Sequence, residues 1–234
     1  MATPMFIVTG FLDSGKTTMI KDTLMEQEWI EPGLTLLLLC EEGEEEYPEE
    51  YLKEKNMAVL KIEEFDQLNT VFFKNCERNY HPAQIIIEYN GMWSAAKIPE
   101  LYDELEEICF DREVIMQTLD VVNDETFSLY MKNMPSLMVE QFKVAEMIIV
   151  NRCTVENTKK SAIRGSVKAV NPRAQIVYES EDDAFYEMKE EMPFDDPAAH
   201  RTVGHAHAGV QQAQVIVDLG HGAHGRAGVV AGGL

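Results

Sequence analysis

Apolar residues along the chain fall into short runs, and stretches with a helical spacing of apolar positions separate most of these runs. Runs of strand size occur at residues 5–9, 34–40, 57–62, 84–88, 113–122, 146–150 and 175–178. Helical spacing occurs at residues 16–27, 64–79, 98–108, 124–143 and 155–170, with a break expected at Pro135. Strands that alternate with helices are typical of βαβ units. The pattern therefore predicts an α/β fold with a mostly parallel central sheet, helices on both faces, and ligands at the carboxyl ends of the strands.

The composition changes near residue 180. We expect one domain over residues 1–180, an acidic linker over 181–197 and a tail over 198–234. The tail is rich in Ala and Gly and has no Lys, Glu or aromatic residue, so it can bury little surface and is expected to be disordered. Three interpretations of the tail stay open: a shifted GC-rich reading frame, a plain disordered segment, or a segment whose His residues bind a transition metal such as Zn²⁺.

The chain is strongly acidic, with a net charge of −21. It is not expected to bind nucleic acid or an anionic membrane, because both attract basic surfaces. No apolar run approaches the roughly 20 residues of a membrane span, and no signal peptide is visible. The four Cys residues form no C-x-x-C pair, as expected for free thiols in a reducing compartment. We therefore expect a cytoplasmic protein without membrane insertion.

The most specific motif follows the first expected strand. The segment GFLDSGKTT fits the pattern G-x-x-x-x-G-K-[ST], in which Gly10 and Gly15 frame the loop before Lys16 and Thr17. Glycines let backbone N–H groups approach a polyphosphate, and the following helix presents its N-terminal N–H groups to the same anion. Lys16 would contact the β- and γ-phosphates, and Thr17 would bind Mg²⁺. A glycine-rich turn that merely connects a strand to a helix would not need a Lys-Thr pair at this spacing. The motif therefore predicts a P-loop NTPase fold that binds a nucleoside triphosphate.

Three other segments place polar candidates after expected strands. Glu88 could reach Mg²⁺ through water and Gly91 could donate its N–H to a γ-phosphate, although an ordinary turn is the alternative. Glu41 lies where a first switch loop would close over Mg²⁺ or position the attacking water, with a solvated acidic loop as the alternative. Asn151 could hydrogen-bond a purine and hold the phosphate loop, and Arg152 could lay its stem along the base.

Four segments together resemble the CobW/UreG/HypB class of SIMIBI GTPases, and its CobW-like branch in particular. They are GFLDSGKTT, the E-x-x-G at Glu88 to Gly91, NRCT, and VNPRAQIVYE at residues 170–179. The resemblance covers about residues 4–179. It implies a GTP-hydrolysing metallochaperone or metal-homeostasis protein, with Mg²⁺ at Thr17 and the guanine base at Asn151. Family members usually carry a further small C-terminal domain, where this chain has its unusual tail.

The chain departs from the family pattern at two places. CobW-like proteins commonly carry a C-x-C-C metal site between the first switch and the Glu strand, whereas Cys76 stands alone in that region. The family reads guanine with an N-K-x-D motif, whereas this chain has Arg152 and Thr154 at the second and fourth positions. The first departure concerns the delivery of a metal by thiolates, and the second concerns the selection of guanine.

The resulting hypothesis is a Mg²⁺-dependent GTPase whose hydrolysis toggles loops at Glu41 to Glu46 and Glu88 to Trp93. The expected catalytic residues are Lys16, Glu41 and Glu88, and the expected metal ligands are Thr17, Glu88 and Glu41. The expected nucleotide-binding residues are Gly10, Asp13, Ser14, Gly15, Lys16, Thr17, Thr18, Gly91, Asn151 and Arg152. The expected ligands are GTP and Mg²⁺, and the expected partner is a metal-dependent protein, with a second copy of the chain as another candidate.

Two other functions remain compatible with the motifs. An ATP-using small-molecule kinase would need an acceptor pocket and a lid, which the sequence does not reveal. A non-hydrolysing interaction module would use the nucleotide only to hold its fold.

Overall fold

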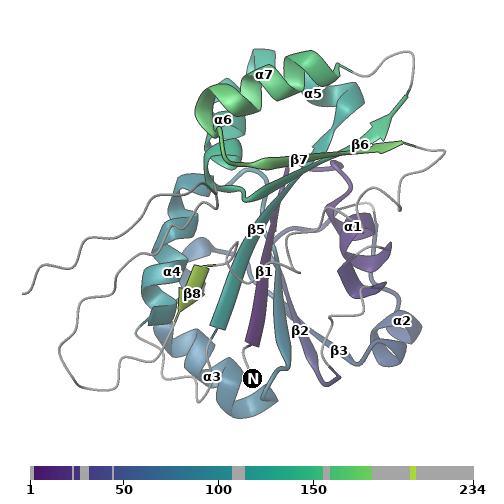
Figure 1. Ribbon diagram of the computed structural model, residues 1–234. Helices are drawn as coiled ribbons and strands as arrows, with labels where there is room; N and C mark the ends of the chain where they lie inside the picture. The colour runs from purple at the N-terminus through teal and green to yellow at the C-terminus, as the bar shows by residue number, and fades with distance from the viewer. Residues whose placement is uncertain are drawn as a thin grey trace, which may run out of the picture.

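The computed structural model describes residues 3–22, 24–26, 32–43, 45–106, 114–154, 159–180 and 201–203. At its centre, seven parallel strands form a sheet in the order β3-β2-β4-β1-β5-β6-β7 (Figure 1). These strands are β1 (Thr3–Thr9), β2 (Thr35–Leu39), β3 (Met57–Lys61), β4 (Gln84–Glu88), β5 (Val114–Asn123), β6 (Met147–Cys153) and β7 (Gln175–Ser180). Strands β1 and β4 are buried almost throughout, as expected for a parallel sheet that is covered on both faces.

Helices follow most of the strands. They are α1 (Lys16–Asp22), α2 (Glu49–Glu54), α3 (Thr70–Tyr80), α4 (Ile98–Glu106), α5 (Asp124–Asn133), α6 (Pro135–Val144) and α7 (Lys160–Val170), with short 3-10 turns η1 (Leu24–Glu26), η2 (Phe65–Gln67) and η3 (Ala95–Lys97). Pro135 is the first residue of α6, where its missing N–H costs no helical hydrogen bond. This confirms the break that was expected within the helix 124–143.

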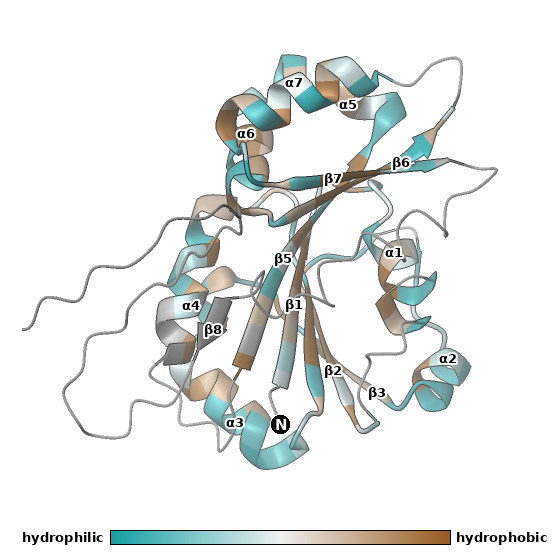
Figure 2. Cartoon of the chain, in the orientation of Figure 1, coloured by the Kyte–Doolittle hydropathy of each residue, from teal (hydrophilic) through white to brown (hydrophobic). Residues whose placement is uncertain are grey.

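The helices lie on both faces of the sheet. α1, η1 and α2 pack on one face, against side chains such as Phe6 and Val8 of β1. α3 and α4 pack on the opposite face, against Met5 and Ile7 of the same strand. α5, α6 and α7 continue that second face over β5 to β7. Figure 2 shows the resulting apolar strands between more polar helices.

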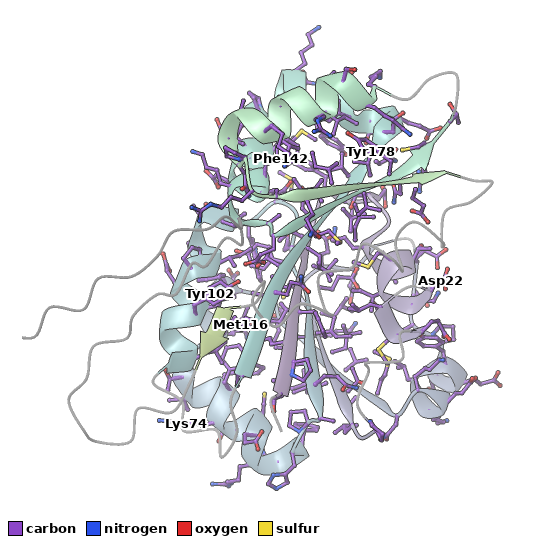
Figure 3. All side chains as sticks on the ribbon, viewed as in Figure 1. Asp22, Lys74, Tyr102, Met116, Phe142 and Tyr178 are labelled. Carbon is purple, nitrogen blue, oxygen red and sulfur yellow. The ribbon has the colours of Figure 1, made fainter. Side chains whose placement is uncertain are left out.

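Figure 3 shows one of these contacts, with Tyr102 of α4 beside Met116 of β5. Tyr102 also shares a buried hydrogen bond of 3.0 Å with the hydroxyl of Thr118.

The predicted α/β class, the largely parallel sheet and the helices on both faces are confirmed. Several elements differ from the expected pattern. The helix expected over residues 64–79 is divided into η2 and α3, and α3 begins only at Thr70. Helix α2 was not expected, because none of its residues is fully buried and its sequence therefore shows no clear apolar spacing. Strand β6 continues beyond residue 150 to Cys153, so that the NRC residues belong to the strand end. Parts of some expected elements lie outside the described residues, namely residues 23, 27, 107–108, 113 and 155–158.

The acidic linker and most of the tail also lie outside the described residues. The exception is β8 (Arg201–Val203), which pairs antiparallel with Val114 to Met116 of β5, at the part of β5 that β6 does not reach. The composition of the tail did not predict this short strand. Across the described part of the chain, no helix combines the length and apolar character that crossing a membrane requires.

The loops that follow β1 and β4 approach each other at backbone distance. A Cβ atom added to Gly91 would lie 2.3 Å from the carbonyl oxygen of Gly10 and 2.8 Å from the Cα of Phe11. A Cβ added to Gly10 would lie 2.4 Å from the carbonyl oxygen of Val121, at a φ of +136°. Glycine is therefore required at both positions for the two loops to meet above the sheet.

We predict that Gly91→Ala lowers thermal stability, because the methyl group meets backbone atoms that cannot move aside without shifting a loop. Overpacking of this kind costs about 1–3 kcal/mol. In a domain of this size, each kcal/mol lowers the melting temperature by about 2–4 °C. The control is Gly165→Ala in α7, where nothing lies within 4 Å of the new Cβ. That substitution should stabilise by about 0.5–1 kcal/mol. Equal melting temperatures in circular dichroism for wild type and Gly91→Ala would show that the loops do not meet so closely.

Candidate functional site

The polar residues that the sequence predicted gather at the carboxyl edge of the sheet. The loop after β1 leads into α1, Glu41 follows β2, and Glu88 is the last residue of β4. Asn151 lies near the end of β6, on the other side of β1. Since parallel strands end at the same edge, residues far apart in sequence come together here.

The loop after β1 has the conformation that its glycines allow. Gly10, Asp13 and Gly15 have φ values of 136°, 58° and 97°. The N–H of Ser14 donates to the carbonyl oxygen of Phe11 at 3.1 Å. Positive φ values turn successive N–H groups toward one side of a loop, which makes an anion-binding concavity. Of the other expected loop residues, Asp13 and Thr18 are exposed and Ser14 is buried.

Asn151 holds this loop against the end of β6. Its Nδ2 donates to the carbonyl oxygen of Ser14 at 2.6 Å. A Cβ on Gly15 would lie 2.5 Å from the same Nδ2, so only glycine allows this approach. Within the described part of the chain, the buried Oδ1 of Asn151 and Oγ of Ser14 have no hydrogen-bond partner. The hydrogen bond joins Asn151 to the loop after β1, and the roles of Asn151 in nucleotide binding stay predictions.

Lys16 is buried beneath the loop, with only 3% of its surface exposed. Its Nζ donates to the carbonyl oxygens of Gly10 and Phe11 at 2.8 and 2.9 Å. The same Nζ forms an ion pair with Oε1 of Glu41. The second carboxylate oxygen of Glu41 accepts a hydrogen bond from the N–H of Gly91 at 3.0 Å. One carboxylate therefore connects the loop after β1 with the segment after β4.

Thr17 and Glu88 form the second polar contact of the site. The hydroxyl of Thr17 donates to Oε1 of Glu88 at 2.7 Å, and the hydroxyl of Tyr47 donates to Oε2. Burial raises the pKa of Glu88 above its ordinary value, although the hydrogen bonds from Thr17 and Tyr47 and the charge of Lys16 oppose this shift. A hydroxyl and a carboxylate at this distance are the oxygen ligands that Mg²⁺ prefers.

A buried carboxylate that the sequence did not reveal lies behind the loop. Asp120 of β5 is fully buried, and its Oδ1 accepts a hydrogen bond of 2.9 Å from the hydroxyl of Thr9. Burial raises the pKa of Asp120 to about 6, while the Thr9 hydrogen bond and the charge of Lys16 act in the opposite direction. Asp120 lies in register with Thr9, which directly precedes the loop.

Hydrogen bonds also fix the segments after β2 and β4 against each other and against α6. Nδ2 of Asn90 donates to the carbonyl oxygen of Cys40 at 3.1 Å. Nε2 of Gln141 donates to the carbonyl oxygen of Gly91 at 3.3 Å. Trp93 packs edge-on against Tyr89 and Phe65. Sequence reasoning placed Asn90 within a switch loop without predicting its contact, and it did not find Gln141, because the partners of both side chains lie 50 residues away along the chain.

Arg152 and Thr154 differ from Asn151 in their surroundings. Arg152 has a φ of 54° and a half-exposed side chain that lies 4.0 Å from a carboxylate oxygen of Glu125. Thr154 is exposed just beyond β6. The structure therefore brings Asn151 to the phosphate loop and leaves both of these side chains at the surface.

The described cysteines are all buried: Cys40, Cys76 and Cys153. Burial raises the pKa of the Cys40 thiol far above its ordinary value and that of Cys76 to about 11, which disfavours the thiolate that binds metals. Among the residues that the structure describes, no three His, Cys, Asp or Glu side chains are grouped so that they could hold a metal ion. Cys109 and the His residues of the tail lie outside the described residues.

Comparisons with solved structures agree with the fold. The hydrogenase maturation factor HypB from Archaeoglobus fulgidus aligns with a TM-score of 0.55 and 17% identity, over 80% of this chain and 86% of that chain. The Zn(II)-bound YjiA GTPase from E. coli aligns with a TM-score of 0.57 and 16% identity, over 82% of this chain. This chain spans 63% of the length of YjiA. At these identities, the likeness shows the fold alone.

A search of curated proteins finds no match. The family model described as "CobW/HypB/UreG, nucleotide-binding domain" matches residues 4–178, which is most of the chain and includes every segment of the site. The chain therefore belongs to the CobW/HypB/UreG family of P-loop GTPases, whose nucleotide-binding domain it contains.

Proposed function

We propose that this protein binds GTP with Mg²⁺ at the edge of the sheet and hydrolyses it, and that turnover controls a metal-related protein partner. The observation that carries this proposal is the convergence of Lys16, Thr17, Glu88 and Gly91 from separate segments at one glycine-rich loop. Residues 41–46 and 88–93 are the first and second switch segments of this mechanism. Membership of a P-loop GTPase family supports the proposal.

The triphosphate would lie against the loop between β1 and α1. The inward N–H groups of the loop would bind its β-phosphate, and the Lys16 ammonium would neutralise charge on the β- and γ-phosphates. Lys16 is suited to this role because its Nζ already lies beneath the loop, against two of its carbonyl oxygens. Asn151 supports the loop from the side of β6.

Thr17 and Glu88 would hold Mg²⁺. The hydroxyl of Thr17 would be a direct ligand, and Glu88 would act through a bound water molecule. The fit rests on the Thr17–Glu88 contact of 2.7 Å and on the burial of Glu88, a carboxylate in need of positive charge. The ion would neutralise charge on the transferring phosphoryl group.

Lys16 and Gly91 would stabilise the charge that develops on the γ-phosphoryl oxygens during hydrolysis. Loss of the γ-phosphate would remove this partner of the Gly91 N–H, and the second switch segment would move as the N–H returns to Glu41, its partner in this structure. Gln141 and Asn90 connect that segment to α6 and to the end of β2, so its movement would reach both elements.

The metal-related role rests on the family alone. YjiA is described as a Zn(II)-bound GTPase and HypB as a hydrogenase maturation factor. We extend a metal-related client to this chain as a proposal, with Zn²⁺ as a candidate cargo and with self-association as a further candidate. The C-x-C-C motif is absent from this sequence, so a delivered metal would need other ligands.

We predict that Lys16→Ala abolishes triphosphate binding while the fold is retained, because a polyphosphate in the loop loses its charge-assisted contact. Isothermal titration with GTP measures this loss, and circular dichroism checks the fold. Lys53→Ala is the matched control, because Lys53 is 76% exposed and forms an exposed ion pair with Glu49, one turn earlier in α2. Unchanged GTP affinity in Lys16→Ala would rule out the loop as the phosphate site.

We predict that Glu88→Gln lowers the affinity of the nucleotide-bound protein for Mg²⁺ by about 10–100-fold. A loss of this size is typical when a carboxylate that holds a metal through water is removed. Because burial raises the pKa of Glu88, wild-type Mg²⁺ affinity should also fall as the pH is lowered toward that pKa. The Gln variant should show a smaller fall, because protonation of the γ-phosphate at about pH 6 is common to both proteins. Mg²⁺ titrations at fixed GTP across pH 5–8 measure both effects, with Glu49→Gln as control. A variant that retains the wild-type Mg²⁺ affinity would exclude Glu88 from the site.

We predict that the protein prefers GTP only weakly over ATP, and that Thr154→Asp sharpens this preference. An aspartate would accept two N–H bonds from guanine, which adenine cannot supply. Hydrogen bonds to a charged group contribute about 1.5–3 kcal/mol, or roughly ten- to hundredfold in affinity. Competition binding with both nucleotides measures the ratio, and Thr154→Asn is the control for shape without charge. If the wild type already prefers GTP by about a thousandfold, or if the Asp variant leaves the ratio unchanged, Thr154 does not face the base.

A further inference from the structure

The Glu41 carboxylate occupies a position between two donors of different segments. One oxygen pairs with Nζ of Lys16 from the phosphate loop, and the other accepts the N–H of Gly91 after β4. The side chain of Glu41 is only 9% exposed, so this contact is enclosed. The next glutamate along the chain behaves differently, because Glu42 is 72% exposed and pairs with the exposed Lys61. Glu41 is therefore enclosed between two donors, whereas the neighbouring Glu42 lies at the surface.

The geometry around Glu41 is held from both sides. Asn90 donates to the carbonyl oxygen of Cys40, the residue directly before Glu41. Gln141 donates to the carbonyl oxygen of Gly91, whose N–H Glu41 accepts. The backbones that carry the carboxylate and its donor are thus tied to each other and to α6. A glutamate in a solvated loop would not have its backbone held in this way.

The two donors are those that a terminal phosphoryl group would need. Under the function proposed above, on which this inference rests, Lys16 serves both the β- and γ-phosphates, while the Gly91 N–H serves the γ-phosphate alone. A carboxylate and a phosphoryl group both present anionic oxygens that can bridge two donors. Glu41 therefore stands where the γ-phosphate would bind, and the two anions cannot occupy the position together.

We propose that Glu41 determines how strongly the site distinguishes a nucleoside triphosphate from a diphosphate. A triphosphate must displace the carboxylate from both Lys16 and Gly91. A diphosphate has no γ-phosphate, so it can share Lys16 while the contact between Glu41 and Gly91 persists. Glu41 thus lowers the affinity for the triphosphate selectively, and its displacement frees the first switch segment from the phosphate loop.

The test is a titration of wild type, Glu41→Gln and Glu49→Gln with GDP and with a non-hydrolysable imido analogue of GTP. Each titration is run in Mg²⁺ and in EDTA. Gln keeps the shape of Glu41 but removes the charge that competes for Lys16. Charge-assisted contacts of this type correspond to about tenfold or more in affinity. Glu41→Gln should bind the analogue about tenfold more tightly in both buffers and change its GDP affinity by less than about threefold. Glu49→Gln should match wild type, because Glu49 is 89% exposed on α2.

Two results would overturn the proposal. Equal tightening for GDP and the analogue would mean that Glu41 acts on nucleotides in general. Weaker analogue binding in Mg²⁺ but not in EDTA would instead identify Glu41 as a metal ligand. Absence of nucleotide binding in all three proteins would refute the proposed function itself, which is a distinguishable outcome. If Glu41→Gln does not fold, Glu41→Asp replaces it, because its shorter side chain cannot bridge both donors and should also favour the analogue.

Discussion

The site depends on a lysine ammonium that is enclosed by protein. Removing a charge from water is costly unless partners replace the lost hydration. Lys16, at 3% exposure, has two loop carbonyl oxygens and the Glu41 carboxylate around its Nζ. Each partner comes from a segment that the fold must position. The loop after β1 and the end of β2 are therefore held together by the requirement to satisfy one charge, and Glu41 connects them to the segment after β4 by accepting the N–H of Gly91.

Close backbone contacts make this arrangement possible. Gly10 meets the backbone of Val121, Gly91 meets the backbone of Gly10, and Gly15 meets the side chain of Asn151, each at a distance where a Cβ atom would not fit. The parallel sheet brings these residues to one edge, and the glycines let the loops approach there. Negative groups are then concentrated around a loop shaped for anions. The carboxylates of Glu41 and Glu88 lie on Lys16 and Thr17, the groups that a nucleotide and its Mg²⁺ would contact under the proposed function.

The sequence predicted the parts of the site that depend on local pattern. The loop motif and the position of Glu88 at a strand end are local features, and Pro135 marked a helix break for the same reason. Contacts between distant segments were not predictable in this way. Tyr47, 41 residues from Glu88, lies on the same carboxylate, and the acidic run around it gave no sign of that contact. Buried Asp120 was hidden within an apolar strand, since its role depends on register with Thr9. Glu41 was expected where a first switch loop would close over Mg²⁺ or position the attacking water, which stays a prediction, and the pattern did not predict its contacts with Lys16 and Gly91.

The most direct test of this account is a crystal structure of the protein with Mg²⁺ and a non-hydrolysable GTP analogue. The account predicts the phosphates against the loop after β1, with Lys16 and the Gly91 N–H on the γ-phosphate and Thr17 on the metal. Glu41 should have moved away from Lys16. A nucleotide bound elsewhere on the chain, or one bound at the loop with the contact between Lys16 and Glu41 intact, would contradict it.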